Sequence, residues 1–151
     1  MNENKQLTDN RKLTLLAEFK SFYQDGKETD LDRLDRIYTQ DIEFHDPIHK
    51  IQGILALKSY IKSLYAKSEK IEFEYTDEVN SENCASIAWL MHFQHPSIAN
   101  GKAISLRGNT LIRFTDRIYY QEDFYDLGAM IYQHVPVLGK LVQFVNSRLR
   151  P

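Results

Sequence analysis

The stretch IYYQEDFYD, residues 118–126, sets acids among tyrosines and a phenylalanine in a run typical of a β-strand. Successive side chains of a strand point to opposite faces of its sheet. One face of this strand is expected to carry Tyr119, Gln121, Asp123 and Tyr125, and the other Ile118, Tyr120, Glu122, Phe124 and Asp126. Acidic side chains beside packed aromatic rings need polar partners, so we expect the strand to border a polar site.

The residues before this stretch predict a sheet of long strands. Residues 71–76 alternate apolar and polar side chains, as in a strand with one face in water, and are expected at an edge of the sheet. Residues 85–95 and 102–114 are richer in apolar and β-branched residues and predict central strands joined by a hairpin loop at 96–101. A tight connection at 115–117 then leads into the last strand, so the sheet is predicted to be antiparallel.

Three helices are predicted ahead of the sheet. The first ends near Gly26, a short second helix begins near Thr29, and a third spans residues 53–68. FHDP, residues 44–47, closes a brief extended run, because the residue before a proline is pushed out of helical geometry. The order predicts an α+β domain: a cone-like curved antiparallel sheet covered on its concave face by N-terminal helices, with room for a small-molecule cavity.

Composition limits the class of protein and the partners. The chain has 151 residues, 42% hydrophobic and 26% charged, which predicts a single globular domain over residues 1–151. A net charge of -2 gives no basic field, so nucleic acid is not an expected partner. Cys84 is the only cysteine, which excludes an internal disulfide and a cysteine-based zinc cluster. The start, MNENKQLTDN, lacks the features of a signal peptide, so a cytoplasmic location is expected.

Two motifs and the order of elements resemble a known family. FHDP at 44–47 and IYYQEDFYDLGAM at 118–130 are similar to the nuclear transport factor 2-like superfamily, in particular its SnoaL-like branch. The resemblance runs from Leu13 to about Tyr132. It implies a cone-shaped domain with a pocket for a small, largely apolar molecule. Because this superfamily contains enzymes, ligand binders and protein-interaction domains, the resemblance leaves those classes open.

Ketosteroid isomerases give one comparison within the superfamily. Their general base is an aspartate directly before a proline, after the second helix, and Asp46 occupies that place. Their oxyanion hole uses a tyrosine on the first helix and an aspartate on the penultimate strand, and the matching positions here are Phe19 and Thr110. Steroid isomerase chemistry is therefore not expected, because two donors that stabilise its oxyanion are missing.

Limonene epoxide hydrolases and polyketide cyclases give the second comparison. In the hydrolases a last-strand aspartate activates the attacking water, and Asp123 matches it. The arginine and aspartate that these hydrolases carry on an earlier strand have no counterpart at residues 91–94. SnoaL-type cyclases use a last-strand aspartate with less fixed partners. The resemblance thus implies Asp123 as acid/base, with Asp46 as a second carboxylate, in cyclase, isomerase or hydratase-like chemistry. The alternative is a non-catalytic ligand-binding or interaction domain.

The expected facing of each strand and helix gives a set of pocket-lining residues. They are Phe19, Tyr23, Phe44, His92, Thr110, Tyr119, Gln121 and Tyr125. If Asp123 faces an apolar cone, desolvation raises its pKa toward the range useful for proton transfer. The histidines at 45, 49, 92 and 95 have no recognisable metal spacing, so neither a metal nor any other cofactor is expected.

The remaining patterns concern surfaces. Trp89, Met91 and Phe93 are interpreted as core or interface, and a homodimer is expected to form through the outer face of the sheet. Residues 127–151 form a C-terminal helical extension, whose apolar stripe consists of Leu138, Leu141, Val142, Val145 and Leu149. We expect this helix to dock on its own domain or on its dimer mate. Its cations are Lys140, Arg148 and Arg150, too few for an expected membrane contact.

Overall fold

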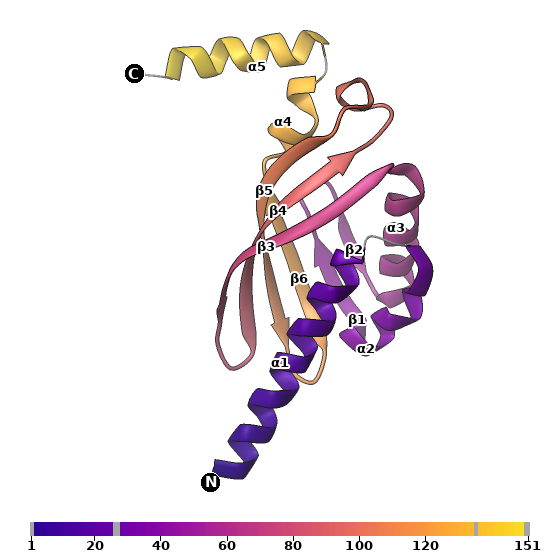
Figure 1. Cartoon of the computed structure of the whole chain (residues 1–151), viewed down its shortest axis with the longest axis vertical. Coiled ribbons are helices and arrows are strands. Elements are labelled where there is room, and N and C mark those ends of the chain that lie inside the picture. The colour runs from indigo at the N-terminus through magenta and orange to yellow at the C-terminus, as the bar shows by residue number, and fades with distance from the viewer. Residues whose placement is uncertain (1, 26–27, 135, 150–151) are drawn as a thin grey trace.

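The computed structural model describes residues 2–25, 28–134 and 136–149 and shows a curved sheet with helices on one face (Figure 1). The helices are α1 (Asn2–Gln24), α2 (Leu34–Ile37), α3 (Ile54–Lys67), α4 (Leu127–Met130) and α5 (Pro136–Leu149), with short 3-10 helices η1 (Glu28–Arg33), η2 (Ala99–Gly101) and η3 (Tyr132–His134). The strands are β1 (Tyr38–His45), β2 (Lys50–Gln52), β3 (Lys70–Asn80), β4 (Cys84–Gln94), β5 (Ile104–Phe114) and β6 (Ile118–Tyr125). This confirms the predicted α+β class.

The six strands form one sheet in the order β2-β1-β6-β5-β4-β3. β3 to β6 are antiparallel and β3 lies at an edge, as predicted. β1, however, pairs in parallel with β6, so the sheet is mixed rather than wholly antiparallel. β1 is also longer than the predicted brief run, since it already begins at Tyr38. The direction of this pairing was not readable locally, because its two strands lie far apart in the sequence.

The concave face of the sheet is apolar because the strands alternate. On β4 the side chains of Ala85, Ile87, Trp89, Met91 and Phe93 all point inward, with at most 6% of each residue exposed. α1 and α3 pack over this face, as Figure 1 shows, and the residues of α1, α3 and the strands form one hydrophobic core. A second apolar cluster continues at the other end of the sheet, where α4 closes it.

A β-bulge changes the facing of β6. Phe114 of β5 pairs with Ile118, but the preceding residue Arg113 pairs with Tyr120, so Tyr119 is an extra residue in the strand. As a result Ile118 and Gln121 are both buried, although strict alternation puts them on opposite faces. After the bulge the alternation continues, so the side chains at 121, 123 and 125 share the concave face.

α5 does not dock on the sheet. It packs against η3 and projects from the end of the cone (Figure 1). Leu138, Leu141 and Val145 of its stripe are 44%, 58% and 49% exposed, so the expected docking on its own domain is wrong, and docking on a dimer mate stays a prediction. The side chain of Leu149 and residue Arg150 lie outside the described part of the chain. Within the described ranges, no helix is long and apolar enough to cross a membrane.

Candidate acid-base site in the cone

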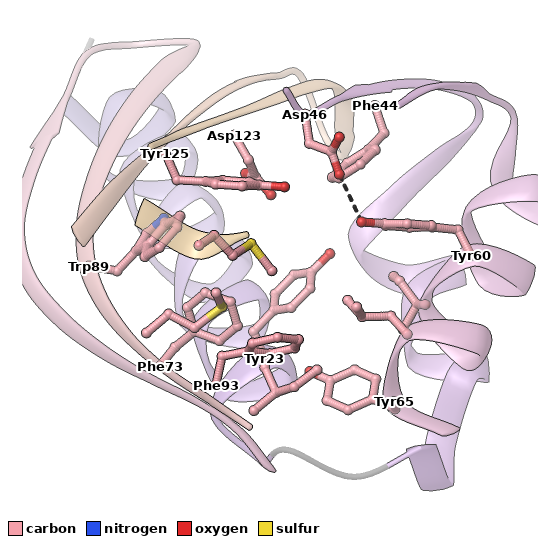
Figure 2. Close-up of a pocket in the computed structure, with 15 residues that line it drawn as sticks. Tyr23, Phe44, Asp46, Tyr60, Tyr65, Phe73, Trp89, Phe93, Asp123 and Tyr125 are labelled. Carbon is pink, nitrogen blue, oxygen red and sulfur yellow. Dashed lines mark hydrogen bonds between the residues drawn. The ribbon is translucent and has the colours of Figure 1, made fainter. Parts of the chain in front are cut away.

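A cavity of about 70 Å³ lies between the concave face of the sheet and the helices α1 and α3 (Figure 2). By this measure one water needs about 10–15 Å³, so the cavity has room for several water-sized positions. Its walls are mainly aromatic: the rings belong to Tyr23, Phe44, Tyr60, Tyr65, Phe73, Trp89, Phe93 and Tyr125. Asp46 and Asp123 are its two acids, and Figure 2 shows both carboxylates near the same end of the cavity.

Asp123 is held by one of its two carboxylate oxygens. Its Oδ1 accepts a hydrogen bond from Thr110 Oγ1 at 2.7 Å and another from Gln121 Nε2 at 3.0 Å. Thr110 lies directly opposite Asp123 in the β5–β6 register, and Gln121 is two residues earlier on the same face of β6. No hydrogen bond to Oδ2 is found among the described residues. The strand pairing therefore fixes the carboxylate and leaves one oxygen for a ligand.

The donors of Asp123 are themselves fixed by buried neighbours. Trp89 Nε1 donates to Thr110 Oγ1 at 2.9 Å, which orients the Thr110 hydroxyl hydrogen toward Asp123. Tyr38 donates its hydroxyl to Gln121 Oε1 at 2.5 Å, and the hydroxyls of Tyr38 and Tyr23 are 2.8 Å apart. Because every member of such a network has a partner, the network stays rigid in an apolar setting.

The surroundings of Asp123 change its acidity. Burial raises the pKa of its carboxyl most strongly, the hydrogen bonds from Thr110 and Gln121 lower it, and the negative charge of Asp46 raises it again. The net result is a pKa of about 6, up from 3.8. Asp123 is therefore mostly ionised at pH 7 but close enough to its pKa to gain and lose a proton readily.

Asp46 caps a turn and lines the cavity at the same time. Its Oδ1 accepts hydrogen bonds from the backbone N–H groups of Ile48 and His49, at 2.7 and 2.6 Å. Its Oδ2 accepts the hydroxyl of Tyr60 at 2.8 Å, the dashed contact in Figure 2. His49 Nδ1 lies 3.1 Å from the same carboxylate. Only 2% of the Asp46 side chain is exposed. Burial, and then the charge of Asp46, raise the pKa of Tyr60, which keeps it a donor.

The structure places six of the eight predicted lining residues at cavities. Tyr23, Phe44 and Tyr125 line the main cavity. Phe19, Thr110 and Gln121 line a smaller neighbouring cavity of about 20 Å³, which also touches Tyr23 and Asp123.

His92 and Tyr119 lie away from both cavities, which corrects the expected lining. His92 alternates with the inward-facing Met91 and Phe93 on β4, so it points outward, where its Nδ1 is 2.7 Å from Ser105 Oγ. Tyr119 is the extra residue of the bulge and is 40% exposed on the outer face. His92 was expected on the wrong face of β4, and Tyr119 changes face because of the bulge in β6.

Tyr60 and Trp89 were not among the predicted lining residues. Tyr60 lies in the third predicted helix, and its hydroxyl needs a partner when buried, which is the signal that could have found it. Trp89 was interpreted as core or interface. Its position depends on Gly108, the residue opposite it on β5: a Cβ there would lie 2.1 Å from the Trp89 ring. An isolated glycine inside a strand is a sign of such close approach.

The described side chains include no group of three or more His, Cys, Asp or Glu arranged to hold a metal ion. The titratable groups that converge on the cavity are the two carboxylates and several tyrosine hydroxyls. This arrangement can accept and return a proton and can donate hydrogen bonds to a ligand oxygen.

Comparisons with known proteins agree with the geometry. The family model for the SnoaL-like domain matches residues 19–120. A comparison with curated proteins gives no match. A candidate SnoaL-like polyketide cyclase from Jannaschia sp. CCS1 superposes with a TM-score of 0.67 at 12% identity, over 76% of this chain and 87% of that chain.

Two further solved structures share the fold. A hypothetical protein from Catenulispora acidiphila, with a ketosteroid isomerase-like fold and crystallised with trimethylamine, has a TM-score of 0.67 at 15% identity, over 78% of this chain and 91% of its own. TerC, co-crystallised with polyporic acid, has a TM-score of 0.67 at 11% identity, over 79% and 94%. Since the family model covers more than half of the sequence, this chain belongs to the SnoaL-like domain family, with the nuclear transport factor 2-like cone that its sequence predicted.

Proposed function

We propose that this SnoaL-like domain binds a small, largely apolar molecule in the cone and catalyses a proton transfer on it, with Asp123 as the acid/base. One observation carries the proposal: Asp123 lies in an aromatic cavity with Oδ1 fixed by Thr110 and Gln121 and with Oδ2 left for a ligand. A general base must reach the proton that it abstracts, and a rigid carboxylate at a cavity wall meets that requirement.

The other polar groups of the cavity fit supporting roles. Asp46 and its donor Tyr60 form a second polar anchor near Asp123. Burial, together with the charges of Asp46 and Asp123, raises the pKa of Tyr125, so its hydroxyl stays protonated and can donate to a ligand oxygen on which negative charge develops. Proton abstraction by Asp123 and return to another atom of the same molecule describes an isomerase, and ring closure after abstraction describes a cyclase.

The relatives support a ligand cavity in this fold but not a particular reaction. One was crystallised in complex with trimethylamine and another was co-crystallised with polyporic acid, so at least two proteins of this fold have been crystallised with small molecules. At 11–15% identity the likeness concerns the fold alone.

A non-catalytic ligand-binding domain is the second candidate. The observation that favours it is the engagement of Thr110, whose hydroxyl donates to Asp123 and not into the cavity, while Phe19 has no hydroxyl to offer. Two positions that carry oxyanion donors in ketosteroid isomerases are thus unavailable here. In this candidate the two carboxylates orient a ligand without exchanging a proton.

An acid-to-amide substitution separates the two candidates. Asp123→Asn keeps the shape of the side chain and the acceptor for Thr110 and Gln121 but removes the exchangeable carboxyl proton. We expect it to bind the substrate found by screening and to lose turnover. The matched control is Glu122→Gln on the same strand, whose carboxylate accepts from Tyr120 instead. Turnover retained by Asp123→Asn would exclude the catalytic role, and binding without turnover in the unaltered protein would favour the second candidate.

A further inference from the structure

The described lining of the main cavity contains two carboxylates and no basic side chain. Asp46 and Asp123 both line it, and the lining set, all of it within the described part of the chain, contains no Lys, Arg or His. Three lysines of the surrounding elements are paired with other acids: Lys20 with Glu78 at 2.8 Å, Lys58 with Asp35 at 2.7 Å and Lys70 with Glu72 at 3.0 Å.

The two carboxylates are balanced unequally. Asp46 accepts two backbone N–H groups and a tyrosine hydroxyl and has His49 beside it, whose side chain is 43% exposed outside the cavity. Within the part of the chain that the structure describes, Asp123 has only two side-chain donors, both neutral and both on Oδ1. The charge of Asp46 also acts unfavourably on that of Asp123. A buried carboxylate without a counter-charge carries a large desolvation cost. A cation in the cavity would supply the missing counter-charge and offset the repulsion between the two carboxylates.

The aromatic walls suit the same kind of ligand. Trp89 lies against Phe73, with ring centroids 5.2 Å apart, and beside Tyr125 at 6.4 Å. Phe44 and Tyr60 form a second pair at 5.4 Å on the Asp46 side. Ring faces attract organic cations through their quadrupole, most strongly when the cation is desolvated. Carboxylates and aromatic faces around one small space make a site that prefers a cation with an apolar surface.

We propose that the ligand of the cone is a small organic cation, an alkyl-substituted ammonium group or a similar cationic group, bound between Asp46 and Asp123 with its alkyl surface on the rings. This inference rests on the proposed function, because it concerns the same cavity. The cavity of about 70 Å³ limits the cationic group to a few heavy atoms. An anionic ligand is disfavoured, since it adds a third negative charge in a region of low dielectric.

A charge-matched pair of probes tests the proposal. Choline carries a trimethylammonium group, and 3,3-dimethylbutan-1-ol replaces it with a neutral tert-butyl group of nearly the same shape. Calorimetric titration of the full chain at pH 8 should give choline an affinity at least about tenfold higher than its neutral isostere. Equal affinities, tighter binding of the neutral probe, or no choline binding up to about 50 mM would overturn the proposal.

Substitutions locate the charge that is recognised. Asp123→Asn and Asp46→Asn should each weaken choline binding about fivefold or more and leave binding of the neutral isostere unchanged. The carboxylate of Glu122 lies on the outer face, so Glu122→Gln should change the binding of neither probe. Asp46→Asn disturbs a turn and could prevent folding. Asp123→Asn keeps its hydrogen-bond partners and should fold, so this variant alone is sufficient for the test. Unchanged choline affinity in Asp123→Asn would contradict the proposed site.

The outcomes separate this proposal from the catalytic one. Charge-dependent choline binding, combined with turnover that survives Asp123→Asn, would remove the acid/base role and keep the cation site. Equal binding of the two probes, combined with turnover lost in Asp123→Asn, would do the reverse.

Discussion

The two ends of the cone are built from the same strands but differ in what fills them. The packed end is the cluster in which Leu34, Ile87, Ile112, Phe114 and Ile118 meet. The cavity end is the cluster of Ile71, Trp89, Met91, Phe93, Leu106 and Met130, next to the two carboxylates. Strand β4 contributes to both, with Ile87 in one and Met91, four residues later, in the other.

The difference shows which end of the cone contributes most to the stability of the fold. At the packed end, close-packed side chains exclude water and supply the free energy of folding. At the cavity end, an unfilled space and a carboxylate with a raised pKa both reduce stability. Such costs are common at functional sites, where stability is traded for a reactive group. The comparison therefore predicts that substitutions at the cavity end cost less stability than those at the packed end, or even add stability.

The largest expected effect comes from truncating matched side chains on β4. Ile87→Ala should lower the free energy of unfolding by about 3 kcal/mol, because it opens a new cavity in a fully buried place. Met91→Ala should cost only about 1–2 kcal/mol, because its side chain already borders an empty space. Urea denaturation of both variants measures the difference. Equal costs would mean that the two ends are packed alike.

The next effect is a gain in stability from Asp123→Asn. Folding raises the pKa of Asp123 from 3.8 to about 6, so above pH 6 the folded state holds an ionised carboxylate at a cost of up to about 3 kcal/mol. The variant removes that cost, and at pH 8 its free energy of unfolding should be about 1–3 kcal/mol higher than that of the unaltered protein. Because the folded state binds the extra proton, the gain should shrink as the pH falls from about 6 to about 4. Glu122→Gln should show no such pH-dependent gain.

A smaller effect is expected at the donor of Asp123. Thr110→Val removes the hydroxyl that stabilises the ionised form, so the pKa of Asp123 should rise above 6 by about one unit. The substitution also removes the hydroxyl oxygen that accepts the hydrogen bond from Trp89 Nε1. Thr110→Ser keeps the hydroxyl and should leave the pKa near its original value. Carboxyl-carbon NMR titration of the two variants measures both, and an unchanged pKa in Thr110→Val would show that this hydrogen bond does not tune Asp123.

The smallest effect is expected from removing residues 136–151. α5 packs against η3 and its apolar side chains are largely exposed, so the loss should change the free energy of unfolding by no more than about 0.5 kcal/mol. A larger loss would show that the helix is part of the folded core. The homodimer through the outer face of the sheet stays a prediction, and sedimentation velocity on both forms would show whether the chain dimerises and whether α5 is needed.

Much of the fold was readable from local patterns. The first helix, the long central strands and the edge position of β3 follow from periodicities of a few residues. The parallel pairing of β1 with β6 was not readable, because it joins strands far apart in the sequence. The bulge at Tyr119 was missed because two-residue alternation assumes an unbroken strand.

The candidate site was readable only in part. Asp123 and Asp46 were found through the resemblance, and the structure places both at one cavity. Tyr60 and Trp89 were missed, since a pattern of hydrophobicity records the ring and ignores the hydroxyl or N–H that finds a partner inside. The facing of His92 depends on which side of β4 is concave, which a single strand pattern does not fix.

The most direct test of the account is the titration of Asp123 in the unaltered protein. A ¹³C NMR titration of its carboxyl carbon, assigned by comparison with Asp123→Asn, should show a midpoint near pH 6. That result would establish a desolvated carboxylate poised for proton transfer at the cavity end. A midpoint near 3.8 would mean that Asp123 is as well solvated as a surface aspartate, and it would contradict both its proposed acid/base role and the contrast between the two ends of the cone.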